Sequence, residues 1–94
     1  MSKLILLHTA SAGTLESSDC LVTVSPAGKL NLEYKGANST VFAERTMCLV
    51  ESIANEYDLK GVEISIQDQG ALEITLRARI ETALERAGKA VAKQ

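Results

Sequence analysis

Aromatic residues, histidine and cysteine are scarce in this chain of 94 residues, and each shortage argues against a class of function. The aromatic rings are those of Tyr34, Phe42 and Tyr57, too few for the stacking platforms that bind single-stranded nucleic acid. One histidine and two cysteines argue against a zinc site built from these ligands. A net charge of −2 argues against a protein that binds the phosphate backbone of nucleic acids.

Long apolar runs are also absent from the sequence. The longest purely aliphatic run covers residues 4–7, whereas a membrane-spanning helix needs about 20 apolar residues and a secretory signal needs about 7–15. We therefore expect a cytoplasmic protein that neither spans a membrane nor is exported. In that reducing compartment we expect Cys20 and Cys48 to be buried free thiols, although the sequence leaves a disulfide between them open.

The rest of the composition is typical of a folded domain. Hydrophobic residues make up 46% of the chain and charged residues 23%. The length predicts one domain, residues 1–94. Within it we expect a variable N-terminal lead over residues 1–11 and a frayed tail over residues 89–94. The apolar run in the lead could form an extra edge strand, contact another subunit, or pack as an ordinary terminus.

Hydrophobic periodicity predicts the main elements. β-Branched residues over 20–25 and alternating apolar residues over 30–35 indicate two strands. The Ser-Pro-Ala-Gly sequence at 25–28 predicts a turn, so we expect these two strands to pair as an antiparallel hairpin. Helical spacing then covers residues 41–57, and alternation over residues 62–67 indicates a third strand.

The segment 68–76 is ambiguous between a hairpin and a helix. Apolar residues alternate from Leu72 to Leu76, but apolar residues also recur at intervals of four up to Leu84, in a stretch of strong helix formers. Gly88 is the expected end of such a helix. The predicted fold is α+β: a two-layer sandwich in which a small, mainly antiparallel sheet carries two helices on one face, in the order strand, strand, helix, strand, helix.

The residues alone indicate no catalytic constellation and no set of metal ligands. His8 has no partner at a recognisable spacing and is expected at the surface or partly packed. Arg77 and Arg79 should face different directions on the last helix, where they could bind a phosphate, bind an acidic partner, or form a solvated surface. Residues 16–19 have the composition of a polar turn, and Gly13 is isolated rather than part of a phosphate-binding loop. Such a domain is expected to carry, bind or assemble something.

Several segments together resemble one family. Residues 12–19 (Ala-Gly-Thr-Leu-Glu-Ser-Ser-Asp) resemble the signature near the N-terminus of the citrate lyase acyl carrier protein, the gamma chain of that enzyme. The likeness continues at residues 60–62 (Lys-Gly-Val), 68–73 (Asp-Gln-Gly-Ala-Leu-Glu) and 76–81 (Leu-Arg-Ala-Arg-Ile-Glu). It therefore extends over most of the chain from residue 12 to residue 87, whereas the apolar lead departs from the family.

The resemblance implies a covalent prosthetic group. In the family a serine carries 2'-(5''-phosphoribosyl)-3'-dephospho-CoA, a phosphoribosyl-dephospho-coenzyme A, through a phosphodiester. The family position is the serine after Thr-Leu-Glu, here Ser17, and Ser18 is the less favoured alternative. Because Glu16 and Asp19 would repel a phosphate, we expect the attachment to depend on a dedicated transferase.

The resemblance also implies a role and partners. The thiol of this prosthetic group (the arm) would carry acetyl and citryl groups as thioesters. An alpha chain would exchange acetyl for citryl on the arm, and a beta chain would cleave the citryl group, releasing oxaloacetate and regenerating the acetyl form. The carrier itself performs neither step. The implied partners are these two chains, the prosthetic-group transferase, and an acetate ligase that acts on the arm.

Three alternatives remain open. The carrier of malonate decarboxylase uses a related prosthetic group. A non-catalytic interaction or regulatory module would pair through a sheet edge and leave Ser17 unmodified. A serine hydrolase would need a base near Ser17, and His8 is the histidine that could supply one.

Overall fold

Within the residues that this computed structural model describes, 2–36 and 39–92, the chain forms six strands and two helices. In chain order they are β1 (Ser2–Leu6), β2 (Ala10–Gly13), β3 (Cys20–Pro26), β4 (Leu30–Lys35), α1 (Ser39–Glu56), β5 (Val62–Asp68), α2 (Glu73–Ala87) and β6 (Gly88–Ala92).

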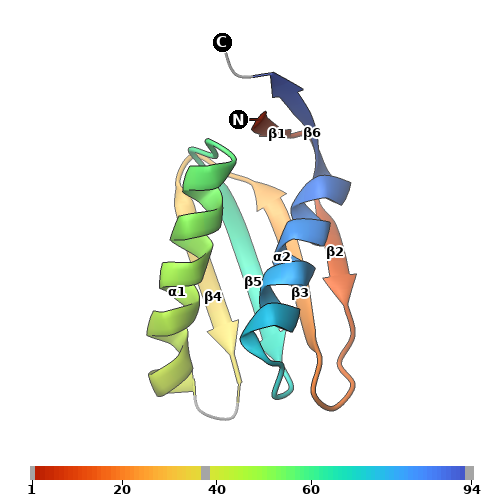
Figure 1. The fold of residues 1–94 in the computed structure, drawn as a ribbon, viewed down its shortest axis with the longest axis vertical. Coiled ribbons are helices and arrows are strands. Elements are labelled where there is room, and N and C mark those ends of the chain that lie inside the picture. The colour runs from red at the N-terminus through yellow and green to blue at the C-terminus, as the bar shows by residue number, and fades with distance from the viewer. Residues whose placement is uncertain (1, 37–38, 93–94) are drawn as a thin grey trace.

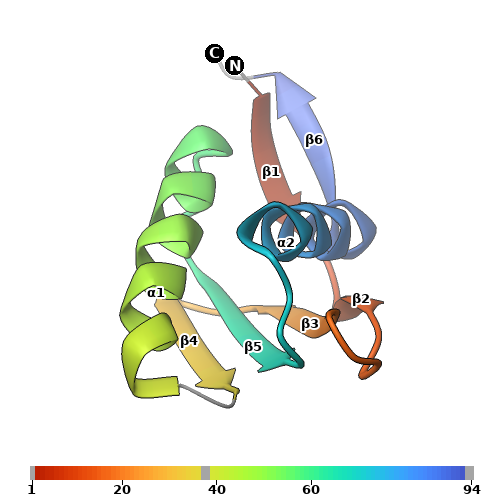
Figure 2. The same ribbon diagram turned by 60° about the horizontal axis from the view of Figure 1, so that its bottom comes forward.

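The central layer is a sheet with the strand order β2-β3-β5-β4. Strand β3 runs antiparallel to both β2 and β5, whereas β4 runs parallel to β5 and is connected to it through α1. Both helices cover one face of the sheet (Figures 1 and 2). The predicted α+β sandwich with two helices on one face is therefore confirmed.

The expected hairpin between residues 20–25 and 30–35 is wrong, because β5 lies between β3 and β4. The turn at residues 26–29 does reverse the chain, but the two strands that it joins are not neighbours. The burial of each strand explains this order. The inward side chains of β5 are almost fully buried, whereas those of β4 are only partly buried, so β5 takes the centre of the sheet and β4 takes an edge.

The hydrophobic core lies between the sheet and the helices. Alternate residues of β3 and β5 point into it, and α1 and α2 each contribute an apolar stripe. The largest fully buried side chains are those of Ile53, Ile64, Ile66, Ile80 and Leu84. The opposite face of β5 carries Glu63, Ser65 and Gln67, so this face of the strand is polar.

The ambiguous segment after β5 is a turn followed by a helix. The Asp68 carboxylate accepts hydrogen bonds from the backbone N–H groups of Gly70 and Ala71, which turns the chain out of the sheet. Helix α2 then begins at Glu73 and ends at Ala87, directly before Gly88 as predicted. Leu76, Ile80 and Leu84, which recur at intervals of four, are buried, whereas Leu72 and Ile74 of the alternating pattern are exposed. The helical spacing therefore describes this segment better than the alternation.

Both chain ends form a two-stranded ribbon beyond the sandwich. Strands β1 and β6 pair antiparallel, and the ribbon projects from one end of the sheet (Figure 1). The frayed tail expected from residue 89 is therefore wrong as far as residue 92, and residues 93–94 lie outside the described part. The apolar run of the lead does form a strand, β1, but β1 pairs with β6 in the ribbon and not at the edge of the main sheet, whose edge strand β2 begins after the run, at Ala10. Leu4 anchors the ribbon, since its side chain is buried and its N–H donates to the Tyr57 carbonyl.

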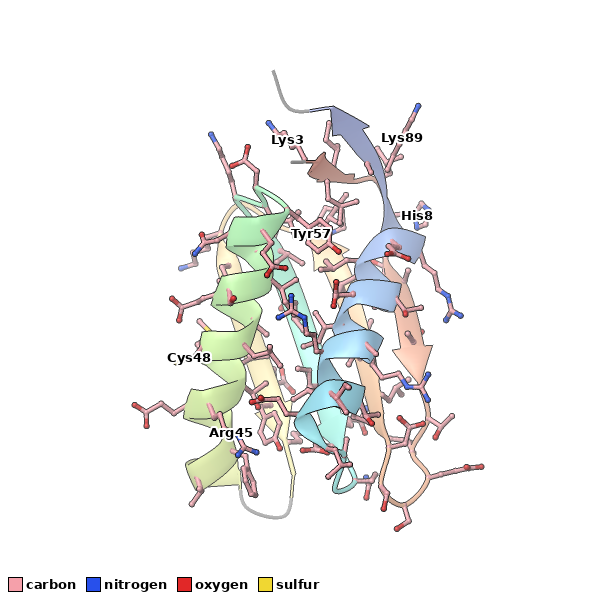
Figure 3. The ribbon with its side chains drawn as sticks, in the orientation of Figure 1. Lys3, His8, Arg45, Cys48, Tyr57 and Lys89 are labelled. Atoms are coloured by element: carbon pink, nitrogen blue, oxygen red, sulfur yellow. The ribbon has the colours of Figure 1, made fainter. Side chains whose placement is uncertain are left out.

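The two cysteines differ in environment. Both are free thiols. Cys20 is buried in β3, and burial is the main cause that raises its pKa to about 11. Cys48 is exposed on α1 (Figure 3), so its expected burial is wrong: it lies on the outward side of the helix. Among the described residues, neither helix is long and apolar enough to cross a membrane.

Candidate functional site

The candidate site is the loop of residues 14–19, which joins β2 to β3 at the end of the sheet opposite the ribbon (Figure 1). Gly13 ends β2 with a φ of 96°, and a Cβ added there would lie 1.9 Å from the carbonyl oxygen of Cys20. This left-handed conformation and this close approach both require glycine. The start of the loop is therefore set by the contact between two strand ends.

Asp19 holds the loop in shape. Its carboxylate accepts hydrogen bonds from the Thr14 hydroxyl at 2.8 Å and from the N–H of Cys20 at 2.7 Å. It also accepts two N–H groups of the Arg79 guanidinium, on α2, at 3.0 Å each. Hydrogen bonding by Arg79, then Cys20 and Thr14, lowers the pKa of Asp19 to about 2. The negative charge of Asp19 is thus balanced within the fold.

The loop is also tied to the turn between β5 and α2. The N–H of Ser18 donates to the Gln69 carbonyl at 2.7 Å, and the N–H of Gln69 donates to the Asp19 carbonyl at 2.9 Å. Ser18 adopts a φ of 66°, a left-handed conformation that is uncommon for residues other than glycine. These bonds join two loops from distant parts of the sequence into one unit.

Ser17 and Ser18 are both exposed on this loop. Within residues 2–36 and 39–92, neither hydroxyl makes a hydrogen bond. Leu15 and Glu16, which precede them, are exposed as well. The Ser17 hydroxyl is therefore accessible to a modifying enzyme.

His8 does not accompany the serines. It is exposed, as expected, and lies near the ribbon (Figure 3). This is the end of β2 away from the loop of residues 14–19, called the Ser17 loop from here on. The serine hydrolase alternative depends on this histidine as its base, and the placement of His8 argues against it.

Of the two carboxylates expected to repel a phosphate, Asp19 is paired with Arg79. Glu16 forms no salt bridge among the residues that the structure describes, so it remains the unbalanced carboxylate next to Ser17. A phosphodiester on Ser17 would meet less negative charge than the sequence suggests.

Arg77 and Arg79 diverge from α2, as predicted. Arg77 donates to Glu56 of α1 at 2.6 Å and to Glu81 at 3.0 Å. The Tyr57 hydroxyl also donates to Glu81, and this bond is the main cause that raises the pKa of Tyr57 to about 12. Arg77 therefore links the two helices, whereas Arg79 links α2 to the Ser17 loop. Both arginines are engaged within the fold rather than only solvated.

Three exposed large apolar side chains lie on segments at the same end of the molecule as this loop (Figure 1), whereas Ile5 is exposed on β1, in the ribbon. Leu15 in the loop is 54% exposed, Leu72 before α2 is 71% exposed, and Ile74 in the first turn of α2 is 77% exposed. Large apolar side chains that remain this exposed near one another are typical of protein contact surfaces. They provide a surface beside Ser17 that a partner protein could cover.

Three of the four segments that carry the family resemblance meet at this site. Residues 12–19 supply the loop, residues 68–73 supply Gln69, and residues 76–81 supply Arg79. Sequence reasoning singled out Arg79 but did not pair it with Asp19, because the partners stand 60 positions apart. In the described part of the chain, no group of three His, Cys, Asp or Glu side chains could hold a metal ion.

Comparisons with known proteins agree on one family. Residues 7–87 match the family model ACP, described as malonate decarboxylase delta subunit (MdcD). The citrate lyase acyl carrier protein of Treponema denticola is 40% identical over 80 residues, covering 85% of this chain and 92% of the relative. That of Edwardsiella ictaluri is 38% identical over 87 residues, covering 89% and 88%.

A solved structure has the same fold. A chain in the crystal structure of a Pseudomonas malonate decarboxylase hetero-tetramer in complex with malonate aligns with a TM-score of 0.63 and 21% identity, covering 94% of this chain and 97% of the other. The chain therefore belongs to the acyl carrier protein family that includes the malonate decarboxylase delta subunit and the citrate lyase acyl carrier proteins.

Proposed function

We propose that this chain is the acyl carrier subunit of a citrate lyase complex and that Ser17 carries a covalently attached phosphoribosyl-dephospho-CoA. Its curated relatives are citrate lyase acyl carrier proteins that match most of their length. The observation that carries the proposal is the exposed, unbonded hydroxyl of Ser17 on a loop held in place by Asp19 and Arg79.

The loop fits a group linked through a phosphodiester. Ser17 points to no hydrogen-bond partner in the described chain and is exposed, so an attached group would extend into solvent. Arg79 balances Asp19, which leaves Glu16 as the carboxylate that opposes a phosphate. The thiol of the attached group would supply the thioester linkage on which acetyl and citryl groups move between the alpha and beta chains.

The chain itself contributes position rather than chemistry. Asp19, Thr14 and Arg79 keep the loop in one shape, so the attachment point stays fixed on a stable body. A tether anchored there keeps its acyl group at high effective concentration near two active sites. Leu15 and Leu72 provide apolar surface for the transferase or the catalytic chains. No histidine adjoins Ser17 and no side chain of the described residues is hydrogen-bonded to its hydroxyl, which fits modification by a dedicated transferase.

The remaining parts of the proposal concern the cellular setting. We infer a single carrier domain that works in the cytoplasm and catalyses neither step. Its partners would be the alpha and beta chains, the prosthetic-group transferase and the acetate ligase that acts on the arm. The first two partners follow from the carrier role, and the last two from the need to install and acylate the arm.

A reconstituted reaction tests the proposal. The alpha and beta chains of a relative's citrate lyase are mixed with this chain as the sole carrier, after treatment with the transferase and its precursor, and oxaloacetate formation from citrate is measured. We expect activity with the wild type and with Ser18→Gly, and none with Ser17→Ala. Glycine suits the left-handed φ of residue 18, so this control removes a hydroxyl without straining the loop. Modified wild-type protein that supports no citrate cleavage would contradict the proposal.

A malonate decarboxylase carrier is the second candidate, because the matching family model bears that description and the similar solved fold comes from that complex. The same modified protein is then combined with decarboxylase catalytic subunits and malonate. Carbon dioxide release without citrate cleavage would favour this candidate, and citrate cleavage alone would favour the first.

A further inference from the structure

The end of the molecule that carries the ribbon is basic, although the chain as a whole has a net charge of −2. Lys3 on β1 and Lys89 on β6 lie at this end (Figure 3). Lys60 lies in the turn after α1 and Lys29 in the turn before β4, and both turns are at the same end (Figure 1). In the ribbon and these two turns, the described residues include four lysines and one carboxylate, that of Asp58.

These lysines are available for a partner. None of the four forms a salt bridge within residues 2–36 and 39–92. By contrast, Arg77 and Arg79 form ion pairs with carboxylates of this chain. The positive charge of the ribbon end is therefore not balanced by salt bridges within the described fold.

A groove lies beside the lysines. It has a volume of about 320 Å³ and runs between β1 and the two turns, with residues 3–6, residues 26–27 and residues 58–61 as its walls. Leucine, isoleucine and proline side chains form much of the wall, and Ile5 is 44% exposed. Lys3 and Lys60 also line the groove, together with the Asp58 carboxylate, so the charged groups along this apolar groove are two lysines and one carboxylate.

We propose that the ribbon end docks a segment of a catalytic subunit in which apolar side chains are flanked by carboxylates. The apolar residues would fill the groove, and the carboxylates would pair with the lysines. Charge complementarity identifies this occupant, because four lysines stand against one carboxylate at this end and none of the four forms a salt bridge within the described residues. The inference rests on the proposed carrier function.

The position of the groove gives the docking a purpose. The molecule is 41 Å along its longest axis, and the ribbon and the Ser17 loop lie at opposite ends of it (Figure 1). A carrier anchored through the ribbon would leave the Ser17 loop uncovered. The tethered arm could then reach the active sites while the body stays bound. One end of the carrier would thus hold the complex together and the other would present the acyl group.

Charge reversal tests the docking. We would measure binding of the full chain to the assembled catalytic subunits for wild type and for the double variant Lys3→Glu/Lys60→Glu. We expect binding to weaken by about tenfold or more, and the wild-type affinity to fall with rising salt more steeply than that of the variant. Lys35→Glu is the control for the single variant Lys60→Glu, because it makes the same charge change on β4, outside the groove, at a side chain that is 73% exposed and pairs with Glu33.

The assay separates the two proposals. Ser17 modification by the transferase is measured in every variant, and Lys60→Glu alone is included in case the double variant unfolds. Normal modification of all variants, with variant affinity equal to that of wild type, would overturn the docking and leave the carrier function intact. Absence of modification in wild type would overturn the carrier function. Lysine-dependent binding to phosphatidylserine vesicles, without binding to the catalytic subunits, would overturn the docking in favour of a membrane.

Discussion

Replacing Gly13 by alanine tests whether the contact between β2 and β3 shapes the Ser17 loop. The new Cβ would lie 1.9 Å from the Cys20 carbonyl oxygen, at a residue whose φ is 96°. A non-glycine residue in such a conformation costs roughly 1–3 kcal/mol, and forcing atoms into occupied space costs roughly another 1–3 kcal/mol. We therefore expect the free energy of unfolding to fall by about 2–6 kcal/mol, a large share of the 5–15 kcal/mol of a typical domain.

Two other glycines separate these contributions. Gly70 has a φ of 89°, but an added Cβ would meet nothing within 4 Å, so Gly70→Ala should show only the conformational cost of roughly 1–3 kcal/mol. Gly28 has no positive φ, and a Cβ added there would meet nothing within 4 Å. The unfolding free energy of Gly28→Ala should therefore lie within about 0.5 kcal/mol of that of wild type.

The assay is urea unfolding followed by circular dichroism, together with the rate at which the transferase modifies Ser17. We expect the losses of stability in the order Gly13→Ala, Gly70→Ala, Gly28→Ala, and slower modification of the first variant. A Gly13→Ala protein as stable as Gly70→Ala would refute the reasoning, because the overlap with the Cys20 carbonyl would then have no consequence.

Three further predictions concern the charge network, the core and the thiols. The pKa of Asp19 is lowered from 3.8 to about 2, so its ionised form stabilises the fold above pH 4, and this contribution is lost as the pH falls from 4 to 2. The difference in unfolding free energy between wild type and Asp19→Asn, measured by urea titration, should therefore shrink over that range. Ile80→Ala should lower the unfolding free energy by about 2–5 kcal/mol. Ile74 lies on the same helix but is 77% exposed, so Ile74→Ala should change the unfolding free energy little. Equal losses in the two variants would contradict the described core. Cys48 should react with a thiol reagent in the folded protein, and Cys20 should react only on unfolding. Mass spectrometry of the labelled protein would show this, and rapid labelling of Cys20 in the native state would argue against its burial.

The helices and the strands with clear alternation were predictable from the sequence, because local periodicity reports which residues are buried. The arrangement of the strands was not. Residues 25–28 do predict a turn, but a turn does not determine whether the strands it joins are neighbours, and the greater burial of β5 placed it between them. The ribbon was missed because β1 and β6 are held by pairing between the two ends of the chain, which no local pattern reveals.

The candidate site was predictable in part. The segment around Ser17 was identified by resemblance, and its exposure agrees with the expected polar turn. The contacts that support it were not predictable from spacing, since Asp19 pairs with Arg79 across 60 positions and Ser18 bonds to Gln69 from another loop. Cys48 illustrates the same limit, because a small side chain on an amphipathic helix can lie on either face.

The central claim, that Ser17 is the attachment site, is tested most directly by the intact mass of the protein after incubation with the transferase and its precursor. The account predicts one mass increment equal to the prosthetic group in wild type and in Ser18→Gly, and none in Ser17→Ala. A mass increment that persists in Ser17→Ala, or a wild-type protein that stays unmodified, would contradict it.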